Sequence, residues 1–330
     1  MPSFFSPHHG RDLHLGRRDP KLRLAGRKLR LRLSDYVQGD REPVVSPPLS
    51  LDWRTYGQES PERTAALADV GLNAELGDCV IEFFAHGRPL WTGGANLPLI
   101  VMTREERLFY YEKIGGYVPS DPSTDGGCDE QDAIDYFTTT GFKDGSHLSG
   151  SVLVDASNWK EVTLANYLFG NVMTGIGGPD AWFDPIPLPG GVWDVAGAPN
   201  ANNGHCTLSM GYDASATTAA PPPVARDTLL VNSWGMPLYV TREALAAYAV
   251  PSAGGELHSI LSEDILNAAT ELAPTGIRWA DLLTDLSLFH QPDRVRRASI
   301  FAEFEEAVER AAAVIGRDHT MLRRKIREHL

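Results

Sequence analysis

The chain has 330 residues, of which 42% are hydrophobic and 22% charged, a globular composition with enough apolar material for a large core. The net charge of −13 combines an acidic body with basic ends, since residues 11–32 carry about +7 and residues 33–293 about −23. The acidic body argues against non-specific nucleic-acid binding. The sequence has no long apolar run and no secretory signal pattern, so we expect neither a membrane-spanning helix nor export.

A basic N-terminal arm and linker, residues 1–50, come first in the chain. Within residues 21–33, leucine alternates with arginine or lysine on both sides of Gly26, and this period of two predicts a strand with one leucine face. A nucleic-acid tail, a membrane-surface patch and a docking arm all fit the composition. Docking accounts best for the leucines, which need apolar cover from the chain's own acidic body, from a second copy or from a larger assembly.

The main domain, predicted over residues 51–290, mixes helical and strand patterns. An apolar helix is expected from Cys79, and a capping box at Thr103 and Glu106 begins a helix that runs to about Lys113. Further helices are expected at 130–139, 241–249 and 276–289, and strands at 151–155, 171–176, 205–212 and 228–232, with a flexible loop from Ala214 to Ala225. A C-terminal extension, residues 291–330, has helical spacing.

Three cysteines, Cys79, Cys128 and Cys206, are spread along the chain without metal-binding spacing. We therefore expect neither a disulfide nor a zinc site, and a reducing compartment is the default. Cys79 stands out because residues 73–79, Asn-Ala-Glu-Leu-Gly-Asp-Cys, run straight into the apolar helix. A cysteine at a helix N-terminus faces unpaired N–H groups and the positive end of the helix dipole, which stabilise a thiolate. The alternative interpretation is a small buried core residue.

Two later segments supply partners for a nucleophilic thiol. His205 opens the segment Gly-His-Cys-Thr-Leu-Ser-Met-Gly-Tyr, and an imidazole beside a thiol can take its proton and return it to a leaving amine. Asn232 lies in Val-Asn-Ser-Trp-Gly, where its oxygen could accept a hydrogen bond from the second imidazole nitrogen and Trp234 could shield that bond from water. Taken alone, His205 would be a structural histidine and Asn232 a turn residue.

Together, the three segments resemble the papain-like cysteine peptidases, whose histidine and asparagine follow the cysteine by roughly 130–150 residues. Here the separations from Cys79 are 126 residues to His205 and 153 to Asn232. Residues 52–54, Asp-Trp-Arg, also resemble the start of such a domain. The resemblance covers roughly residues 51–265 and is closest to papain-like proteins of bacteria and bacteriophages, which share the box before the cysteine.

The resemblance implies an α+β, papain-like fold of two lobes, a helical lobe with Cys79 and a β-rich lobe with His205 and Asn232. It implies a cysteine peptidase or related amide hydrolase that acts on a peptide or protein without a cofactor or metal. Asn73 stands where the family has a glutamine, so its amide and the Cys79 backbone N–H would stabilise the oxyanion. The substrate cleft would be lined by Gly126, Gly127 and Trp234.

Two departures from the family pattern keep a second interpretation open. Asp78 places a carboxylate next to the thiol, which raises the pKa of the thiol if the two are close. Leu76 stands where the family has a cysteine, which leaves Cys128 without that disulfide partner. The alternative is a papain-fold structural component of a phage virion or other large assembly, with weak or no activity. The expected location is accordingly cytoplasmic or virion-associated.

Overall fold

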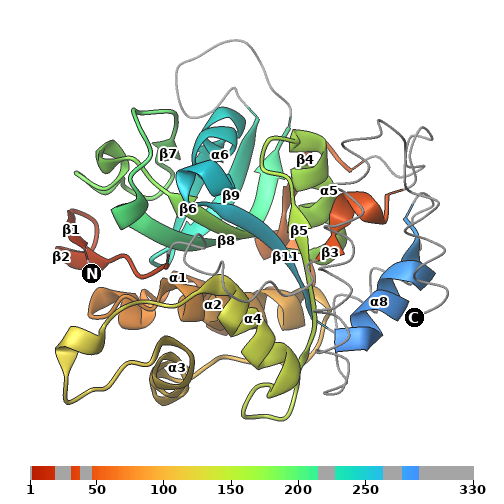
Figure 1. The fold of residues 1–330 in the computed structure, drawn as a ribbon, viewed down its shortest axis with the longest axis horizontal. Helices are drawn as coiled ribbons and strands as arrows, with labels where there is room; N and C mark the ends of the chain where they lie inside the picture. The colour runs from red at the N-terminus through yellow and green to blue at the C-terminus, as the bar shows by residue number, and fades with distance from the viewer. Residues whose placement is uncertain (1, 19–30, 38–46, 215–226, 263–276, 290–330) are drawn as a thin grey trace, which may run out of the picture.

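The structure, a computed structural model, describes residues 2–18, 31–37, 47–214, 227–262 and 277–289. Figure 1 shows helices α1 to α4 gathered below a large twisted sheet, with the N-terminal strands β1 and β2 beside the boundary between the two parts. Helices and strands are thus segregated, and this confirms the predicted α+β class.

The helices are short, apart from the one that begins at Cys79. They are α1 (Pro61–Ala68), α2 (Cys79–Gly94), α3 (Arg104–Tyr110), α4 (Glu130–Thr139), α5 (Trp159–Phe169), α6 (Arg242–Tyr248) and α8 (Trp279–Phe289). Helix α2 is buried on every face against α1 and the sheet, which explains why it is mostly apolar and why its polar residues Glu82, His86 and Arg88 are buried as well. None of the helices in the described residues is long and apolar enough to cross a membrane.

The sheet has nine strands, and the long strand β8 runs through its centre. Its order is β3-β5-β11-β6-β8-β9-β10-β7, with β4 paired to β8 off this path. The strands are β3 (Leu31–Arg32), β4 (Ser50–Asp52), β5 (Leu148–Val154), β6 (Met173–Gly177), β7 (Val192–Trp193), β8 (Gly204–Asp213), β9 (Thr228–Ser233), β10 (Met236–Thr241) and β11 (Glu256–Ser262). Most neighbours are antiparallel, and nearly all of β8 is buried, so polar residues on this strand face protein on both sides.

Several elements follow the sequence prediction closely. The predicted helix at 130–139 is α4, and the capping box of α3 forms as expected, with Thr103 Oγ1 accepting from the Glu106 N–H and the Glu106 carboxylate accepting from the Thr103 N–H. Helix α5 and strand β11 were not predicted. Strand β11 lacks the polar-apolar alternation of a half-exposed strand because all seven of its residues are buried, Glu256 and His258 among them.

The N-terminal arm packs on the chain's own body wherever the structure describes it. Strands β1 (Ser3–Ser6) and β2 (Arg11–His14) form a hairpin, and the next residues run between the helices and the sheet. Of the predicted strand at 21–33, residues 21–30 lie outside the described residues. Leu31 and Leu33 are buried while Arg32 is exposed, and β3 pairs with β5, so the predicted alternation holds for these three residues.

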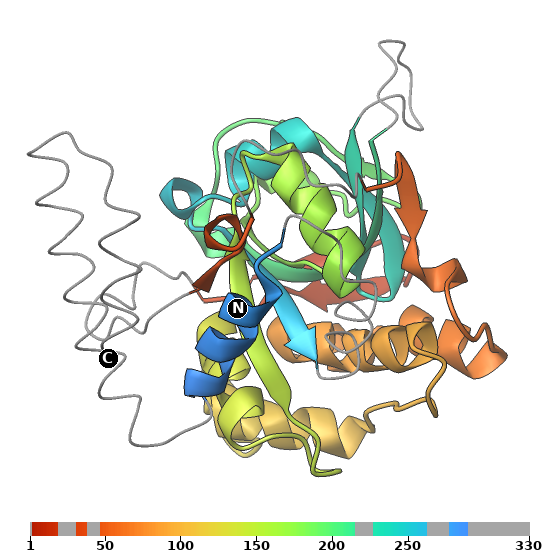
Figure 2. The same cartoon turned by 90° about the vertical axis from the view of Figure 1, so that its right-hand side faces the viewer.

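Two other predicted segments lie outside the described residues, namely the C-terminal extension at 291–330 and, apart from Ala214, the loop that ends at Ala225. The predicted domain boundaries after residues 50 and 290 stay predictions. Figure 2 shows helix α8 packed at the end of the sheet that carries β3 and β5. Its Leu286 reaches the backbone of β5 so closely that Gly150 has no room for a side chain.

Candidate active site

Three of the four residues predicted to act in catalysis line one small hollow. Cys79 is the first residue of α2, Asn73 lies in the turn before it, and Asn232 lies on β9. They share the hollow between α2 and the sheet with Glu82, His86, Cys206 and Trp234. The elements that the sequence placed far apart are thus brought together, and the thiol faces the centre of the sheet.

His205 does not line this hollow. Its ring stacks on Trp234, with ring centres 4.3 Å apart, and its Nε2 shares a 2.8 Å hydrogen bond with Ser233 Oγ. Its Nδ1 has no hydrogen-bond partner among the described residues, so the structure contains no hydrogen bond between Cys79 and His205. Trp234 does cover the imidazole, but the hydrogen bond between His205 and Asn232 that the sequence predicted it would shield is not formed in the described part of the chain.

The partner of His205 also differs from the one expected. Asn232 Nδ2 donates to the Leu67 carbonyl at 2.7 Å, and Asn232 Oδ1 has no partner within the described part of the chain. The reason is strand alternation. The register of β8 against β9 sets Asn232 opposite Leu208, on the face away from His205, and therefore puts Ser233 on the imidazole's face. Ser233 is a site residue that the sequence analysis missed, although the Asn-Ser dipeptide contained it.

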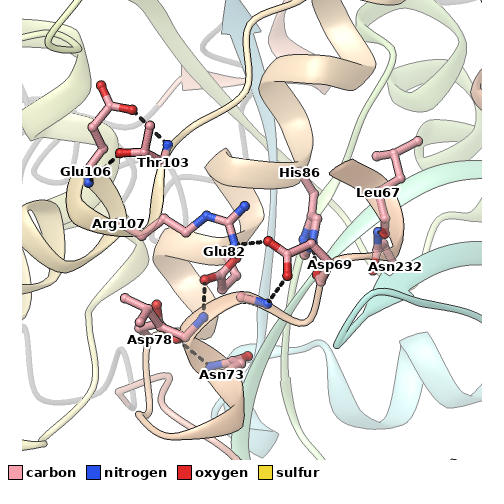
Figure 3. A network of polar contacts seen from close by, with 12 residues as sticks. Leu67, Asp69, Asn73, Asp78, Glu82, His86, Thr103, Glu106, Arg107 and Asn232 are labelled. Carbon is pink, nitrogen blue, oxygen red and sulfur yellow. Dashed lines mark hydrogen bonds and ion pairs between the residues drawn. The ribbon is translucent and has the colours of Figure 1, made fainter. Parts of the chain in front are cut away.

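A buried acid pair holds the amide of Asn73. Asn73 Nδ2 donates to Asp78 Oδ1 at 2.8 Å and to the Leu76 carbonyl, so it is not free to face a substrate oxygen. Burial and the nearby Glu82 carboxyl raise the pKa of Asp78 well above its usual range. Figure 3 shows Arg107 beyond this pair, between Glu82 and the chain turn that carries Asp69.

The protonation states in this arrangement are those of an idle site. Burial raises the pKa of the Cys79 thiol to about 12, with Asp78 adding to the shift against the backbone N–H groups of Cys206 and Gly16. Burial and the charge of Arg17 lower the pKa of His205 to about 3. A thiol and a neutral imidazole are therefore present near neutral pH, and the thiolate–imidazolium pair is absent.

Residues 13–18 cause this burial, because they lie over Cys79 as an extended segment. The Arg17 N–H donates to the Gly204 carbonyl at 3.1 Å, and the Cys128 N–H donates to the Gly16 carbonyl at 2.8 Å. The segment is thus joined to the residue before His205 on one side and to the loop before α4 on the other. Gly16 has no room for a Cβ, since one would overlap the Gly77 backbone next to the thiol.

The residues expected to line a substrate cleft lie under the same segment. The Gly126 carbonyl accepts from Arg18 Nε at 3.0 Å, Trp234 Nε1 donates to the His14 carbonyl at 3.2 Å, and the Gly127 N–H donates to Tyr111 Oη beside them. Residues 14–18 of the chain therefore lie where the sequence pattern predicted a cleft. The sequence analysis treated the arm as a docking segment and did not place it here.

A cluster of buried charges accompanies the segment. Arg17 Nε lies 2.8 Å from Glu130, Arg17 Nη2 lies 4.0 Å from Glu256, and His258 Nε2 lies 3.3 Å from the same Glu256 oxygen. Glu130, Glu256 and His258 offer atoms close enough to one another to hold a metal ion. The guanidinium of Arg17 lies among them and supplies the positive charge there. All three cysteines are buried and free, as predicted for Cys128 and Cys206.

Comparison with known proteins finds no matching family model and no matching curated protein. Similar solved structures include digestive procathepsin L 3 of Tenebrio molitor larval midgut, with a TM-score of 0.48 and 14% identity over 72% of this chain and 75% of that one. Xylellain, a cysteine protease from Xylella fastidiosa, has a TM-score of 0.46 and 15% identity over 71% and 98%. The bromelain protease from Ananas comosus has values of 0.43 and 13% over 65% and 99%.

With identities of 13–15% and TM-scores below 0.5, these structures carry no argument about this chain. Its fold and its activity are argued from its own residues. The predicted closeness to bacterial and bacteriophage proteins gains nothing from these structures and stays a prediction.

Proposed function

We propose that this chain is a cysteine peptidase or related amide hydrolase, described here in a closed form. The observation that carries the proposal is that a cysteine at a helix N-terminus lies beneath an extended peptide segment held by backbone hydrogen bonds on both sides. Backbone groups that hold residues 13–18 would hold another extended peptide in the same place. A scissile carbonyl could then lie close to the sulfur of Cys79.

In the open form, Cys79 attacks the carbonyl carbon while His205 takes the thiol proton. The N-terminus of α2 stabilises the thiolate, and the Cys79 backbone N–H with the Asn73 amide would stabilise the oxyanion. His205 then protonates the leaving amine, and a water molecule releases the acyl group with His205 as the base. Asn232 is the residue proposed to orient His205 in that form, a role that Ser233 fills in the closed form.

Opening requires three changes that follow from the closed geometry. Residues 13–18 leave, which admits water and removes the burial that sets the pKa values of Cys79 and His205. The imidazole turns from Ser233 towards the sulfur. The Asn73 amide exchanges Asp78 for the substrate oxygen. For Asn232 to orient His205, the register of β8 against β9 must change as well, because it sets the two side chains on opposite faces of the sheet in the closed form.

The second candidate is a papain-fold structural component of a larger assembly, with weak or no activity. The observation in its favour is that Cys79 and His205 make no hydrogen bond and that a carboxyl group lies next to the thiol. The two candidates predict opposite results once the covering segment is displaced, because only an enzyme gains activity.

Hydrolysis by a displaced variant tests the proposal. Gly16→Val places a side chain where the Gly77 backbone lies, so it should lift residues 13–18 from Cys79 in the full chain. We expect this variant to cleave a fluorescent casein substrate at least about tenfold faster than the unaltered chain, since burial no longer opposes the thiolate. Gly16→Val with Cys79→Ala is the matched control and should be inactive. A folded Gly16→Val protein with no more activity than this control would favour the structural candidate.

A further inference from the structure

The side chain of Arg17 lies in a buried acidic pocket beside the hollow of Cys79, since Glu130 also interacts with Cys206 of that hollow. The side chain is 1% exposed, and the side chains of Glu130 and Glu256, at 0% and 6%, form its walls. The Gly254 carbonyl accepts from Arg17 Nη1, and Gly175 on β6 lies so close to Arg17 Nε that a Cβ there would overlap it. The pocket is thus built around a guanidinium, with acidic walls and a floor without a side chain.

We propose that this pocket recognises an arginine side chain of the peptide on which the enzyme acts, and that Arg17 holds the place of that side chain in the closed form. The inference rests on the proposed function for the identity of the ligand as substrate. It goes beyond that function by naming the substrate class, peptides with an arginine next to the scissile region.

The division of contacts along residues 13–18 supports this assignment. Arg17 and Gly16 bind the body through backbone N–H and carbonyl groups, which every residue type except proline carries. Such contacts hold an extended chain without choosing its sequence, whereas a pocket for one side chain supplies the choice. The side chain of Arg17 enters a charged pocket, so we expect sequence selectivity at the position that Arg17 occupies.

The charges of the pocket select a cation. Glu130 and Glu256 are both buried, and burial raises the pKa of Glu130 while Arg17 opposes that rise. His258 lies 3.3 Å from Glu256, so without Arg17 it is Glu130 that loses its paired cation in a dry pocket, which is costly. A neutral or acidic side chain leaves this cost in place, and an arginine or lysine side chain removes it.

Geometry then favours arginine over lysine. The three nitrogens of Arg17 lie near three partners: Nη1 donates to the Gly254 carbonyl, while Nε lies 2.8 Å from Glu130 and Nη2 4.0 Å from Glu256 as charge contacts. A lysine ammonium is a single point of charge and cannot reach all three groups at once. We therefore expect the order of preference to be arginine, then lysine, then neutral side chains.

Binding of a synthetic peptide tests the pocket without requiring turnover. The full chain with Gly16→Val and Cys79→Ala would be titrated with fluorescent Arg-Asp-Leu-His-Leu-Gly-Arg-Arg, the sequence of residues 11–18, and with versions that have lysine or methionine at the seventh position. The arginine peptide should bind at least about tenfold more tightly than the methionine peptide, with lysine between them. Equal affinity of the three peptides, or tighter binding of the methionine peptide, would overturn the proposal.

Two pocket variants in the same background show whether the preference arises where we place it. Glu130→Gln should reduce the preference for arginine over methionine to less than about threefold, because one charged hydrogen-bond acceptor is lost. Gly175→Ala should weaken binding of the arginine peptide, because the added Cβ overlaps the place of the guanidinium. Binding of the methionine peptide, which depends on backbone contacts, should change less. A preference that survives both variants would locate the selectivity elsewhere and contradict the pocket.

A measurement on the closed chain guards against poor folding of Gly16→Val. With Gly16 intact, Arg17→Lys and Arg17→Met should both speed alkylation of Cys79 by iodoacetamide, and methionine should do so several-fold more, because it leaves Glu130 without its paired cation. Equal rates for the two variants would contradict a need for positive charge. Arginine-selective binding without hydrolysis would contradict the proposed peptidase activity and support the proposed arginine pocket. Hydrolysis without arginine preference would support the activity and contradict the pocket.

Discussion

Side-chain alternation along β8 and β9 decides which polar groups meet at the site. The sequence places His205, Asn232 and Ser233 on strands, but the face on which each lies depends on the register between the strands, which the sequence does not reveal. In the closed form, this register lets Ser233 form a hydrogen bond with His205, while Asn232 donates a hydrogen bond to the Leu67 carbonyl. Asn73 and Cys79 could be foreseen more easily because they belong to one short segment at the start of α2.

The sequence predicted the effect of Asp78 on the pKa of the neighbouring thiol, but not the residues that surround Asp78. The carboxyl does raise the pKa of the Cys79 thiol, as expected, although burial is the larger cause. Its second partner, Glu82, lies one helical turn further along α2 and makes a buried pair of acids. The pair was not foreseen because helical spacing alone does not show which face of α2 the turn before it packs on.

The acid pair makes stability depend on pH. The pKa of Asp78 is raised in the folded chain, so the folded state holds a proton that the unfolded state releases, and stability falls as pH rises from the unfolded pKa of about 4. Burial raises the pKa of Glu82 to about 7 despite Arg107, so the loss should extend to about pH 7. Relative to Asp78→Asn, we expect the unfolding free energy of the unaltered chain to fall by up to about 1.4 kcal/mol per pH unit in this window.

Urea unfolding at several pH values between 4 and 7 measures this slope. Asp144→Asn is the control, because bonds from Ser146 and Arg88 lower the pKa of Asp144 against the effect of burial. The stability from Asp144 is lost only as pH falls below about 4, so it should be constant between pH 4 and 7. Parallel pH profiles for the unaltered chain and Asp78→Asn would contradict the protonated pair.

At the scale of elements, α2 and its neighbour α3 are joined by a buried ion pair. Arg107 on α3 lies 3.2 Å from Glu82 on α2 and 2.7 Å from Asp69, and its side chain is 4% exposed. The sequence foresaw both helices from their apolar spacing and capping box. It could not foresee this pair, because an arginine in a helix next to two glutamates reads as part of a solvated face.

Removal of this arginine should be costly. Arg107→Met leaves Glu82 buried without its cation, and because the pKa of Glu82 is already raised to about 7, the carboxyl then takes up a proton, so we expect a loss of about 1–3 kcal/mol in the free energy of unfolding. Arg104→Met on the same helix is the matched control. Arg104 pairs with Glu75 while both are 57% exposed, so its loss should be below about 1 kcal/mol. Similar losses for the two variants in urea unfolding would show that the Arg107 pair is not buried as described.

At the scale of the whole molecule, the described parts of the N-terminal arm belong to the folded body. Leu13 and Leu15 belong to the hydrophobic core, and Arg17 joins the helical part to the sheet through α4 and β11. The sequence predicted that basic residues and leucines of the arm would pack on an acidic surface, and the described parts of residues 1–50 do pack on their own chain. Docking of the arm on a second copy or on an assembly stays a prediction.

The place of the arm could not be read from its own sequence. The strand pattern at 21–33 drew attention to a segment that lies mostly outside the described residues, whereas residues 13–18 carry no periodic pattern and make the decisive contacts. Their partners, Gly77, Cys128 and Gly204, are distributed over more than 120 positions of the chain. These partners lie next to residues 13–18 only because of how α2, α4 and β8 are arranged in the fold.

The central claim is that Cys79 is a nucleophile kept idle by residues 13–18, and covalent labelling tests it most directly. A peptidyl epoxide, which reacts slowly with ordinary thiols, would be incubated with the unaltered chain, Gly16→Val and Gly16→Val with Cys79→Ala, and intact mass and peptide mapping would locate the adduct. We predict one adduct, on Cys79 of Gly16→Val, slow labelling of the unaltered chain and none of the double variant. A folded Gly16→Val protein that stays unlabelled, or that is labelled only at Cys128 or Cys206, would contradict the account.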